Sequence, residues 1–309
     1  MKFNPRARLD PSQVRDRRGT PSTGGGLSGG FRGGRLPVGG AAGGGIGTVV
    51  VLVIVFFIYQ GVSGGSSSPT DAGLPNDTNL SAECTTGQDA NTNSDCAKVA
   101  EVNSIQSYWT SALPQLAGVD YSPAQTEFFT ASTTTMCGDA TSATGPFYCP
   151  VDDTVYIDLS FFHDMLQGQL GARGGEFAEA YVLAHEYGHH IQDLLGTMSK
   201  VRTQQGATSD SVRLELQADC YGGMWGRAAT STTDTAGVAI ISELTQDDIA
   251  RAIDAAQAVG DDRIQQESGG RIDPDQWTHG SAAEREHWFM TGYQQGSLQA
   301  CDTFSASSL

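Results

Sequence analysis

The chain has 309 residues, a length that accommodates one large domain or two small ones, and a formal net charge of −17. Residues 1–45 carry eight Lys and Arg against two Asp and Glu, a net charge of +6, whereas the remainder of the chain carries −23. An acidic body repels phosphate groups, which argues against nucleic acid as a partner.

The first 45 residues are predicted to be a disordered, basic, cytoplasmic tail. Between residues 23 and 45, 12 of the 23 residues are Gly, so there is little apolar surface to bury. The basic cluster at residues 15–18 could contact nucleic acid. We favour a role in membrane retention instead, because a long apolar run follows.

Residues 46–62 are predicted to form a transmembrane helix. Residues 46–59 are almost purely apolar, and no charged residue occurs between residues 36 and 70. With its flanking Gly and Ala residues, the run reaches the ~20 residues needed to span a bilayer. Because the basic residues precede it, the positive-inside rule places the N-terminus in the cytoplasm and the body outside.

The alternative to an anchor is a cleaved signal peptide. The long head before the apolar run, and the lack of a clear A-x-A site after it, favour an uncleaved single-pass anchor in the cell membrane. Residues 63–83 are then a flexible linker rich in Gly, Ser, Pro, Asp and Asn. Residues 84–309 form the folded domain.

All six cysteines lie in this outer part of the chain. An even number confined there indicates disulfides formed in an oxidising compartment. Six cysteines allow 15 pairings, but two equal spacings suggest two local loops, and the two remaining cysteines would then pair. The predicted bonds are Cys84–Cys96, Cys137–Cys149 and Cys220–Cys301.

Two segments of regular structure follow the linker. A helix is predicted over residues 94–113, with Ser94 or Asp95 as its cap and Pro114 just after its end. Residues 147–159 are predicted to form a strand region, because apolar and polar side chains alternate near its end.

Residues 185–189 read H-E-x-x-H. On an α-helix, residues four apart lie on the same face, so His185 and His189 can bind one metal ion. Zinc suits imidazole ligands, and Glu186 could take the proton of a zinc-bound water. Gly188 costs helix propensity, which indicates that another element packs closely behind the site. A chance match is the alternative.

A second motif makes a chance match harder to maintain. Glu215 and Asp219 are also four residues apart, and the two motifs lie on predicted helices at residues 176–195 and 210–227. A catalytic zinc with two His ligands needs a third protein ligand, which we assign to Glu215. Asp219 would accept the free ring N–H of a ligating His. Taken alone, the pair could be an exposed acidic helix face.

The last informative segment runs from Thr278 to Tyr293 and contains a predicted helix. Attack on a peptide carbonyl builds negative charge on its oxygen, which a donor positioned near the zinc would stabilise. His279 is our candidate for this role, with Arg285 as the second. The alternatives are helix capping by Thr278 or Ser281 and a structural ion pair for Arg285.

Taken in order, these motifs resemble the bacterial putative neutral zinc metallopeptidases. The resemblance covers nearly the whole chain and is carried by residues 10–19, 145–150, 155–158, 185–192, 215–220 and 278–281, with Arg285, Trp288 and Phe289. The metal site is also similar to that of gluzincin peptidases, in which a Glu-x-x-x-Asp motif supplies the third ligand. The resemblance implies a helix-rich, zincin-like α+β domain, with residues 147–159 as the strand that would pair with the substrate backbone. An ordinary core strand is the alternative.

The sequence therefore predicts a membrane-anchored zinc metallopeptidase, an endopeptidase rather than an exopeptidase, acting on peptides or proteins. Zn²⁺ would be held by His185, His189 and Glu215, and Glu186 would be the general base. The alternative is a non-catalytic, membrane-anchored binding protein with a structural zinc site. Two G-x-S-x-G matches lie in Gly-rich spacers, without the strand and helix that a serine nucleophile requires.

Overall fold

The computed structural model describes residues 1–19 and 80–309. The predicted transmembrane helix at residues 46–62, and the predicted linker as far as residue 79, lie outside the described residues. The remaining linker residues, 80–83, form a short helix with Leu80 buried, so the prediction of a flexible linker is wrong there. Within the two described parts of the chain, no helix is both long enough and apolar enough to cross a bilayer.

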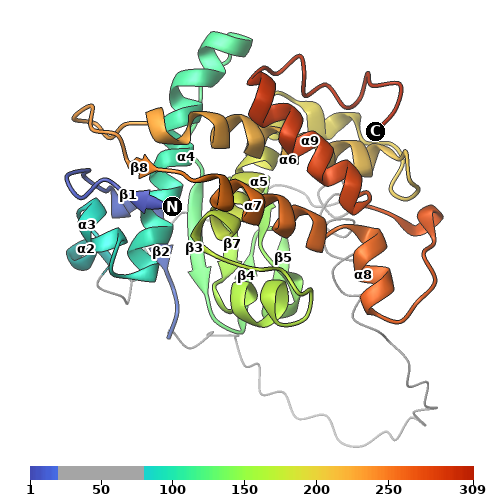
Figure 1. The fold of residues 1–309 in the computed structure, drawn as a ribbon, viewed down its shortest axis with the longest axis horizontal. Helices are drawn as coiled ribbons and strands as arrows, with labels where there is room; N and C mark the ends of the chain where they lie inside the picture. Colours follow the sequence, from blue (N-terminus) through green and yellow to red (C-terminus); the bar gives the residue numbers. More distant parts are fainter. Residues whose placement is uncertain (20–79) are drawn as a thin grey trace, which may run out of the picture.

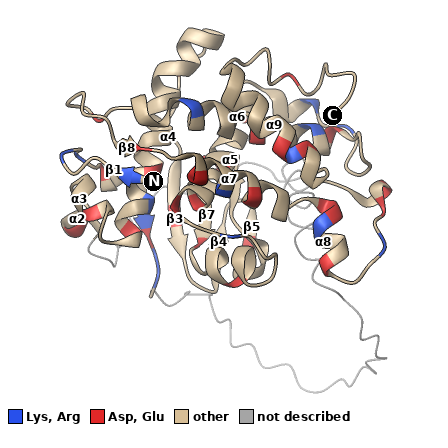
Figure 2. Ribbon diagram, in the orientation of Figure 1, with Lys and Arg blue, Asp and Glu red and all other residues tan. Residues whose placement is uncertain are grey.

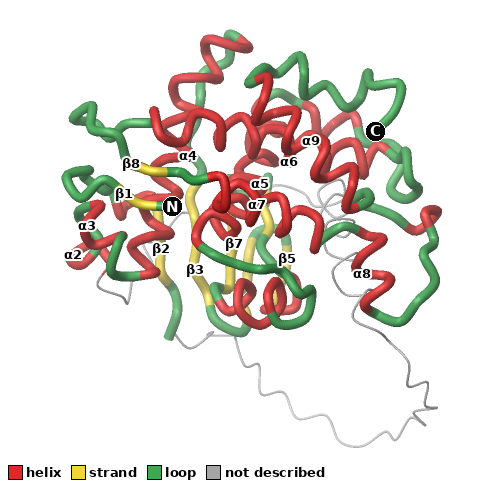
Figure 3. The backbone as a smooth tube through the Cα atoms, in the orientation of Figure 1, coloured by secondary structure: helices red, strands yellow, loops and turns green. Residues whose placement is uncertain are grey.

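The described residues form a helix-rich α+β unit, as the sequence predicts. Helices gather around α5, and a small sheet lies beside them (Figure 1, Figure 3). The α-helices are α2 (Leu80–Glu83), α3 (Gly87–Ala90), α4 (Ser94–Ala117), α5 (Glu176–Leu194), α6 (Asp210–Ala228), α7 (Gln246–Ala258), α8 (Asp261–Glu267) and α9 (Ala282–Gln295). The strands are β1 (Lys2–Phe3), β2 (Val14–Asp16), β3 (Gln125–Phe129), β4 (Ser132–Thr135), β5 (Gly138–Thr141), β6 (Phe147–Cys149), β7 (Thr154–Asp158) and β8 (Ile241–Glu243).

Helix α5 lies at the centre of the fold. It packs against α4, α6 and α7, and α9 in turn packs against α6. Its aromatic side chains Phe177, Tyr181 and Tyr187 are at most 1% exposed, and burial of an aromatic residue of this kind contributes ~1.5–3 kcal/mol. Because nearly the whole helix is buried, the side chains at residues 185–189 are held in fixed positions.

The ends of the long helices follow local signals in the sequence. Helix α5 begins after Gly175, and Gly196, in the left-handed region at φ 69°, follows its last turn, as predicted. Helix α4 differs from its prediction at both ends. Asn93 caps it rather than Ser94 or Asp95, and it continues through Pro114 to Ala117 in an exposed last turn, although a proline inside a helix removes a backbone hydrogen bond.

The main sheet has four strands in the order β2-β3-β7-β6. β2, β3 and β7 are parallel, whereas β6 is an antiparallel edge strand. The strand predicted over residues 147–159 is therefore two strands joined by a turn. The alternating apolar and polar side chains of β7 do not divide into a core face and a solvent face. Val155 and Ile157 are buried in the main core. Tyr156, on the opposite face, is buried in a second cluster with Phe129 and Phe147.

The N-terminal segment, residues 1–19, is part of this folded unit. β1 pairs with β8, and β2 pairs with β3. Phe3, Leu9 and Val14 are buried in the main core. The prediction of a disordered tail is therefore wrong for residues 1–19, while residues 20–45 lie outside the described residues. The composition of this segment did not indicate its buried residues, because the strands that pair with β1 and β2 lie more than 100 residues away in the chain.

Three arginines of the N-terminal segment lie close to carboxylates within the folded unit. Lys and Arg residues of this segment lie among Asp and Glu residues at the same end of the molecule (Figure 2). Arg18 forms ion pairs with Asp16 and Asp95, and Arg15 and Arg17 lie 3.7 and 3.6 Å from the buried carboxylate of Glu127. These pairs offer a structural role for the cluster that we had interpreted as a membrane-retention signal.

The three predicted disulfides are confirmed. Two close short loops, and the third joins helix α6 to the C-terminal segment. The bonds are Cys84–Cys96, Cys137–Cys149 and Cys220–Cys301. Three disulfides indicate an oxidising, extracytoplasmic environment for the domain.

Candidate metal centre

Helices α5 and α6 bring three potential metal ligands together. His185 and His189 lie one turn apart on α5, and Glu215 faces them from α6. The Nε2 atoms of the two histidines lie 3.1 and 3.4 Å from the two carboxylate oxygens of Glu215. One ligand atom from each residue lies within 4.8 Å of the others, which is close enough for all three to bind one ion.

The chemistry of this cluster fits zinc. All three side chains are buried, and the Oε1 atom of Glu215 accepts no hydrogen bond. A buried carboxylate oxygen without a partner is costly, and a cation between the three side chains would satisfy it. Burial alone would raise the pKa of Glu215, but His189 and His185 hold that pKa well below its ordinary value. The ligand is therefore anionic, and two imidazoles with one carboxylate are a donor set that binds Zn²⁺.

Gly188 explains how the two helices approach so closely. A Cβ atom built on Gly188 would lie 2.8 Å from the backbone oxygen of Ala218 and 2.9 Å from its Cα. Only a glycine fits there, so the close packing that the sequence predicts behind the motif is present. The contact sets the separation of α5 and α6 at the level of the metal ligands.

His185 is fixed from behind by Asp219, as the spacing of the second motif predicts. Its Nδ1 atom lies 2.8 Å from Oδ1 of Asp219, which orients the ring so that Nε2 faces Glu215. Tyr181 also donates a hydrogen bond to Asp219, a contact that no sequence motif indicated. Burial would raise the pKa of Asp219, but Arg285 and His185 lower it to about 2.

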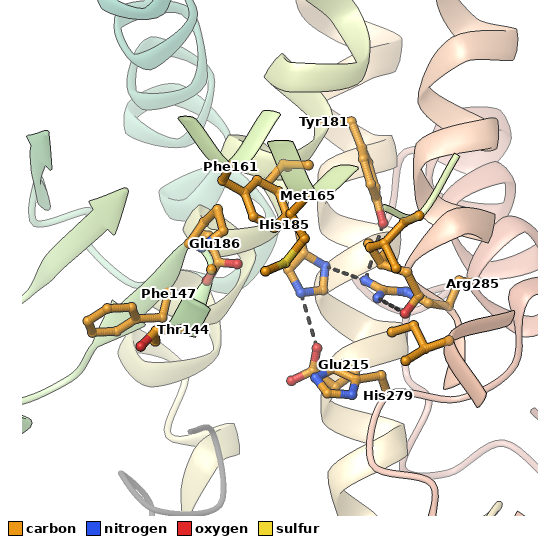
Figure 4. A pocket seen from close by; sticks show the side chains of 16 residues that line it. Thr144, Phe147, Phe161, Met165, Tyr181, His185, Glu186, Glu215, His279 and Arg285 are labelled. Carbon is orange, nitrogen blue, oxygen red and sulfur yellow. Dashed lines mark hydrogen bonds and ion pairs between the residues drawn. The ribbon is translucent and has the colours of Figure 1, made fainter. Parts of the chain in front are cut away.

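Arg285, our second candidate for the oxyanion, lies behind His185 (Figure 4). Its Nε and Nη2 atoms are 2.7 and 2.9 Å from the two carboxylate oxygens of Asp219. Two charge-assisted hydrogen bonds occupy this guanidinium. The structural ion pair that the sequence left open for Arg285 is thus present, and Ser281 caps α9.

His279 lies next to Glu215 (Figure 4). Its Nδ1 atom is 2.9 Å from the Thr278 hydroxyl and 3.3 Å from Oδ1 of Asp261. The second oxygen of Asp261 accepts the backbone N–H groups of Thr278, His279 and Gly280. Burial would lower the pKa of His279, but Asp261 raises it. Sequence reasoning missed Asp261, because an isolated acid 18 residues upstream carries no motif.

Glu186 borders a cavity together with the metal ligands. Burial raises the pKa of Glu186, and the electrostatic interaction with His185 and His189 partly offsets that rise. The cavity has a volume of about 90 Å³. Apart from Glu186 and the residues around the metal site, the wall of the cavity is largely apolar. The apolar side chains that line it are Phe147, Phe161, Met165, Leu170, Val182, Val259 and Ile264.

Comparisons with known proteins agree with this site. The model of a family described as putative neutral zinc metallopeptidase matches residues 1–304. The chain is 49% identical over 230 residues to an uncharacterized protein of Mycobacterium tuberculosis strain H37Rv, a match that covers 74% of this chain and 76% of the relative. It is 47% identical over 196 residues to the uncharacterized protein YpfJ of Escherichia coli K12, covering 62% and 64%. No solved structure matches the chain.

Proposed function

The chain belongs to the putative neutral zinc metallopeptidase family, and on that premise we propose that it hydrolyses peptide bonds in an extracytoplasmic compartment. The observation that carries this proposal is the position of Glu186. It directly follows a ligand, it borders the cavity, and a purely structural zinc site has no use for a base there.

We assign the following roles to the residues of the site. His185, His189 and Glu215 would hold the zinc, which when bound supplies a Lewis acid and lowers the pKa of water. Glu186 accepts a proton from the attacking water and passes it to the leaving nitrogen. His279, held by Asp261, donates a hydrogen bond to the carbonyl oxygen as negative charge develops on it.

The cavity supports a preference for one kind of substrate. Its apolar wall would accept a large aliphatic or aromatic side chain next to the scissile bond, and a volume of about 90 Å³ suits one such side chain. Residues 144–147 line the cavity and lead into β6, an edge strand of the sheet. We propose that β6 pairs with the substrate backbone by strand addition.

Endopeptidase action also belongs to this proposal. The charged side chains lining the cavity are those of the metal cluster and its partners, Glu186, Glu215, His185, His279 and Arg285. Each of these lining groups already has a role in the proposed site, so none of them remains to bind the free terminus of a peptide, as an exopeptidase requires. We further propose, from the apolar sequence alone, that residues 46–62 associate with the membrane without placing the N-terminus on the side opposite the domain. We also propose that the domain has a zincin-like fold.

A peptide-library digest tests the proposed activity. Full-length protein in detergent, loaded with zinc, should cleave peptides, stop when a chelator is added and recover when zinc is restored. The Glu186→Gln variant should keep its zinc, because it removes no ligand, but lose about 10²- to 10⁴-fold in rate.

Two outcomes would contradict the proposal. Cleavage that survives full removal of the metal would exclude this mechanism. A wild-type protein that holds zinc in this site but cleaves no peptide would instead support the alternative, a non-catalytic binding protein that zinc stabilises.

A further inference from the structure

The two histidine ligands have chemically different partners behind them. His185 has a carboxylate, Asp219, which itself pairs with an arginine. His189 has a neutral amide, because its Nδ1 atom lies 2.8 Å from Oε1 of Gln192. Gln192 is fully buried, so water does not compete for this contact.

The orientation of the Gln192 amide is determined by its other partners. Its Nε2 atom lies 2.6 Å from the backbone oxygen of Leu214 and 3.2 Å from Oε1 of Gln217. Both partners are acceptors, so the NH₂ end must face them and the oxygen must face His189. His189 therefore carries its hydrogen on Nδ1 and presents a free Nε2 to the metal site.

Gln217 continues this chain of hydrogen bonds away from the metal. It lies on α6 between Glu215 and Asp219, and its Nε2 atom donates to the backbone oxygen of Cys301 at 2.9 Å. Cys301 is joined to Cys220 by the disulfide between α6 and the C-terminal segment. The residue whose carbonyl ends the chain of hydrogen bonds, Cys301, is thus linked covalently to α6.

We propose that Gln192 and Gln217 form a relay of positioning residues, and that the Cys220–Cys301 disulfide makes zinc retention at His189 sensitive to redox conditions. This inference concerns regulation of the proposed active site. It rests on His189 being a zinc ligand and does not depend on peptide hydrolysis.

The expected effect of reduction follows from the contacts. A dithiol reductant supplies two electrons and two protons, the S–S bond becomes two thiols, and the reductant leaves as its own disulfide. Cys301 then loses its covalent link to α6, and the hydrogen bonds of Arg213 with Thr303 and Ala306 are left to keep the C-terminal segment there. The carbonyl of Cys301 therefore positions Gln217 less firmly. Gln217 in turn fixes Gln192, and a mobile amide orients the His189 ring less well.

The test measures zinc affinity by competition with a chromogenic chelator, using the full-length protein in detergent. Gln192→Leu should weaken zinc binding by about 10- to 100-fold, as expected for loss of a ligand's hydrogen-bond partner. Replacing both cysteines, in C220A/C301A, should weaken it by about tenfold, toward the lower end of that range. The matched control C84A/C96A removes a disulfide that has no contact with the relay, and it should bind zinc like the wild type.

A combined variant separates a relay from general loosening of the fold. If the disulfide acts through Gln192, adding C220A/C301A to Gln192→Leu should cause little further loss, whereas independent effects would add. Thermal unfolding of the zinc-free variants identifies any that fail to fold. Equal losses in the two disulfide variants, additive losses in the combined variant, or wild-type affinity in Gln192→Leu would overturn the relay. Absence of peptidase activity would leave these zinc measurements intact.

Discussion

Substitution of Gly188 by alanine tests the claim that close packing of two helices builds the metal site. The new Cβ atom would lie 2.8 Å from the backbone oxygen of Ala218, whereas ordinary contacts begin at 3.4 Å. Backbone atoms cannot rotate away, so α5 and α6 must separate by the difference, about 0.6 Å, well beyond the ~0.2 Å that metal–ligand distances tolerate. We expect zinc affinity to fall at least tenfold, or ~1.4 kcal/mol.

The same substitution also affects stability. Alanine gains up to ~1 kcal/mol of helix propensity over glycine, but overpacking costs ~1–3 kcal/mol, so the zinc-free protein should be unchanged or slightly destabilised. Gly222→Ala on α6 is the matched control. Its Cβ would meet no atom closer than 3.6 Å, so it should gain stability and keep its zinc affinity.

Zinc competition and thermal unfolding with and without chelator distinguish the two variants. If Gly188→Ala binds zinc as tightly as the wild type and unfolds at a higher temperature, as expected of Gly222→Ala, the packing argument is refuted.

Three further predictions concern other buried groups. Asp261→Asn removes the group that raises the pKa of His279, so the alkaline limb of the kcat profile should move to lower pH; an unmoved profile would contradict the role of His279. Arg285→Gln leaves Asp219 buried without its cation and should lower the free energy of unfolding by ~3–5 kcal/mol in urea titrations, and a loss below ~1 kcal/mol would argue against the pair. Burial raises the pKa of Glu101, and the ammonium of Lys98, 2.7 Å away, offsets only part of that rise. The folded state then keeps a proton that the unfolded chain has released, so stability should fall as the pH rises above about 5, and Glu101→Gln should remove this slope.

Local signals in the sequence predicted the elements that build the site. The helices predicted at residues 176–195 and 210–227 agree with α5 (Glu176–Leu194) and α6 (Asp210–Ala228) to within one residue. Equal spacing was enough to pair four cysteines. Even the close contact at Gly188 could be predicted, because a glycine inside a buried helix needs a packing reason.

What the sequence did not reveal depends on contacts between distant parts of the chain. Gln192 and Asp261 are ordinary polar residues until the fold places them beside His189 and His279. The role of Arg285 was left open for the same reason, because one arginine can serve an oxyanion or a carboxylate, and only the position of Asp219 decides between them.

The pairing of β2 with β3 also limits how the protein can be threaded through a membrane. Residue 19 and residue 80 are the two ends of the intervening stretch, and both belong to one disulfide-bonded body. No bilayer can pass between two strands of the same sheet. Residues 1–19 and the domain must therefore lie on the same side of any membrane, which disagrees with the predicted topology of a cytoplasmic N-terminus and an outer domain. A reporter fused to the N-terminus should be found on the same side as the zinc ligands.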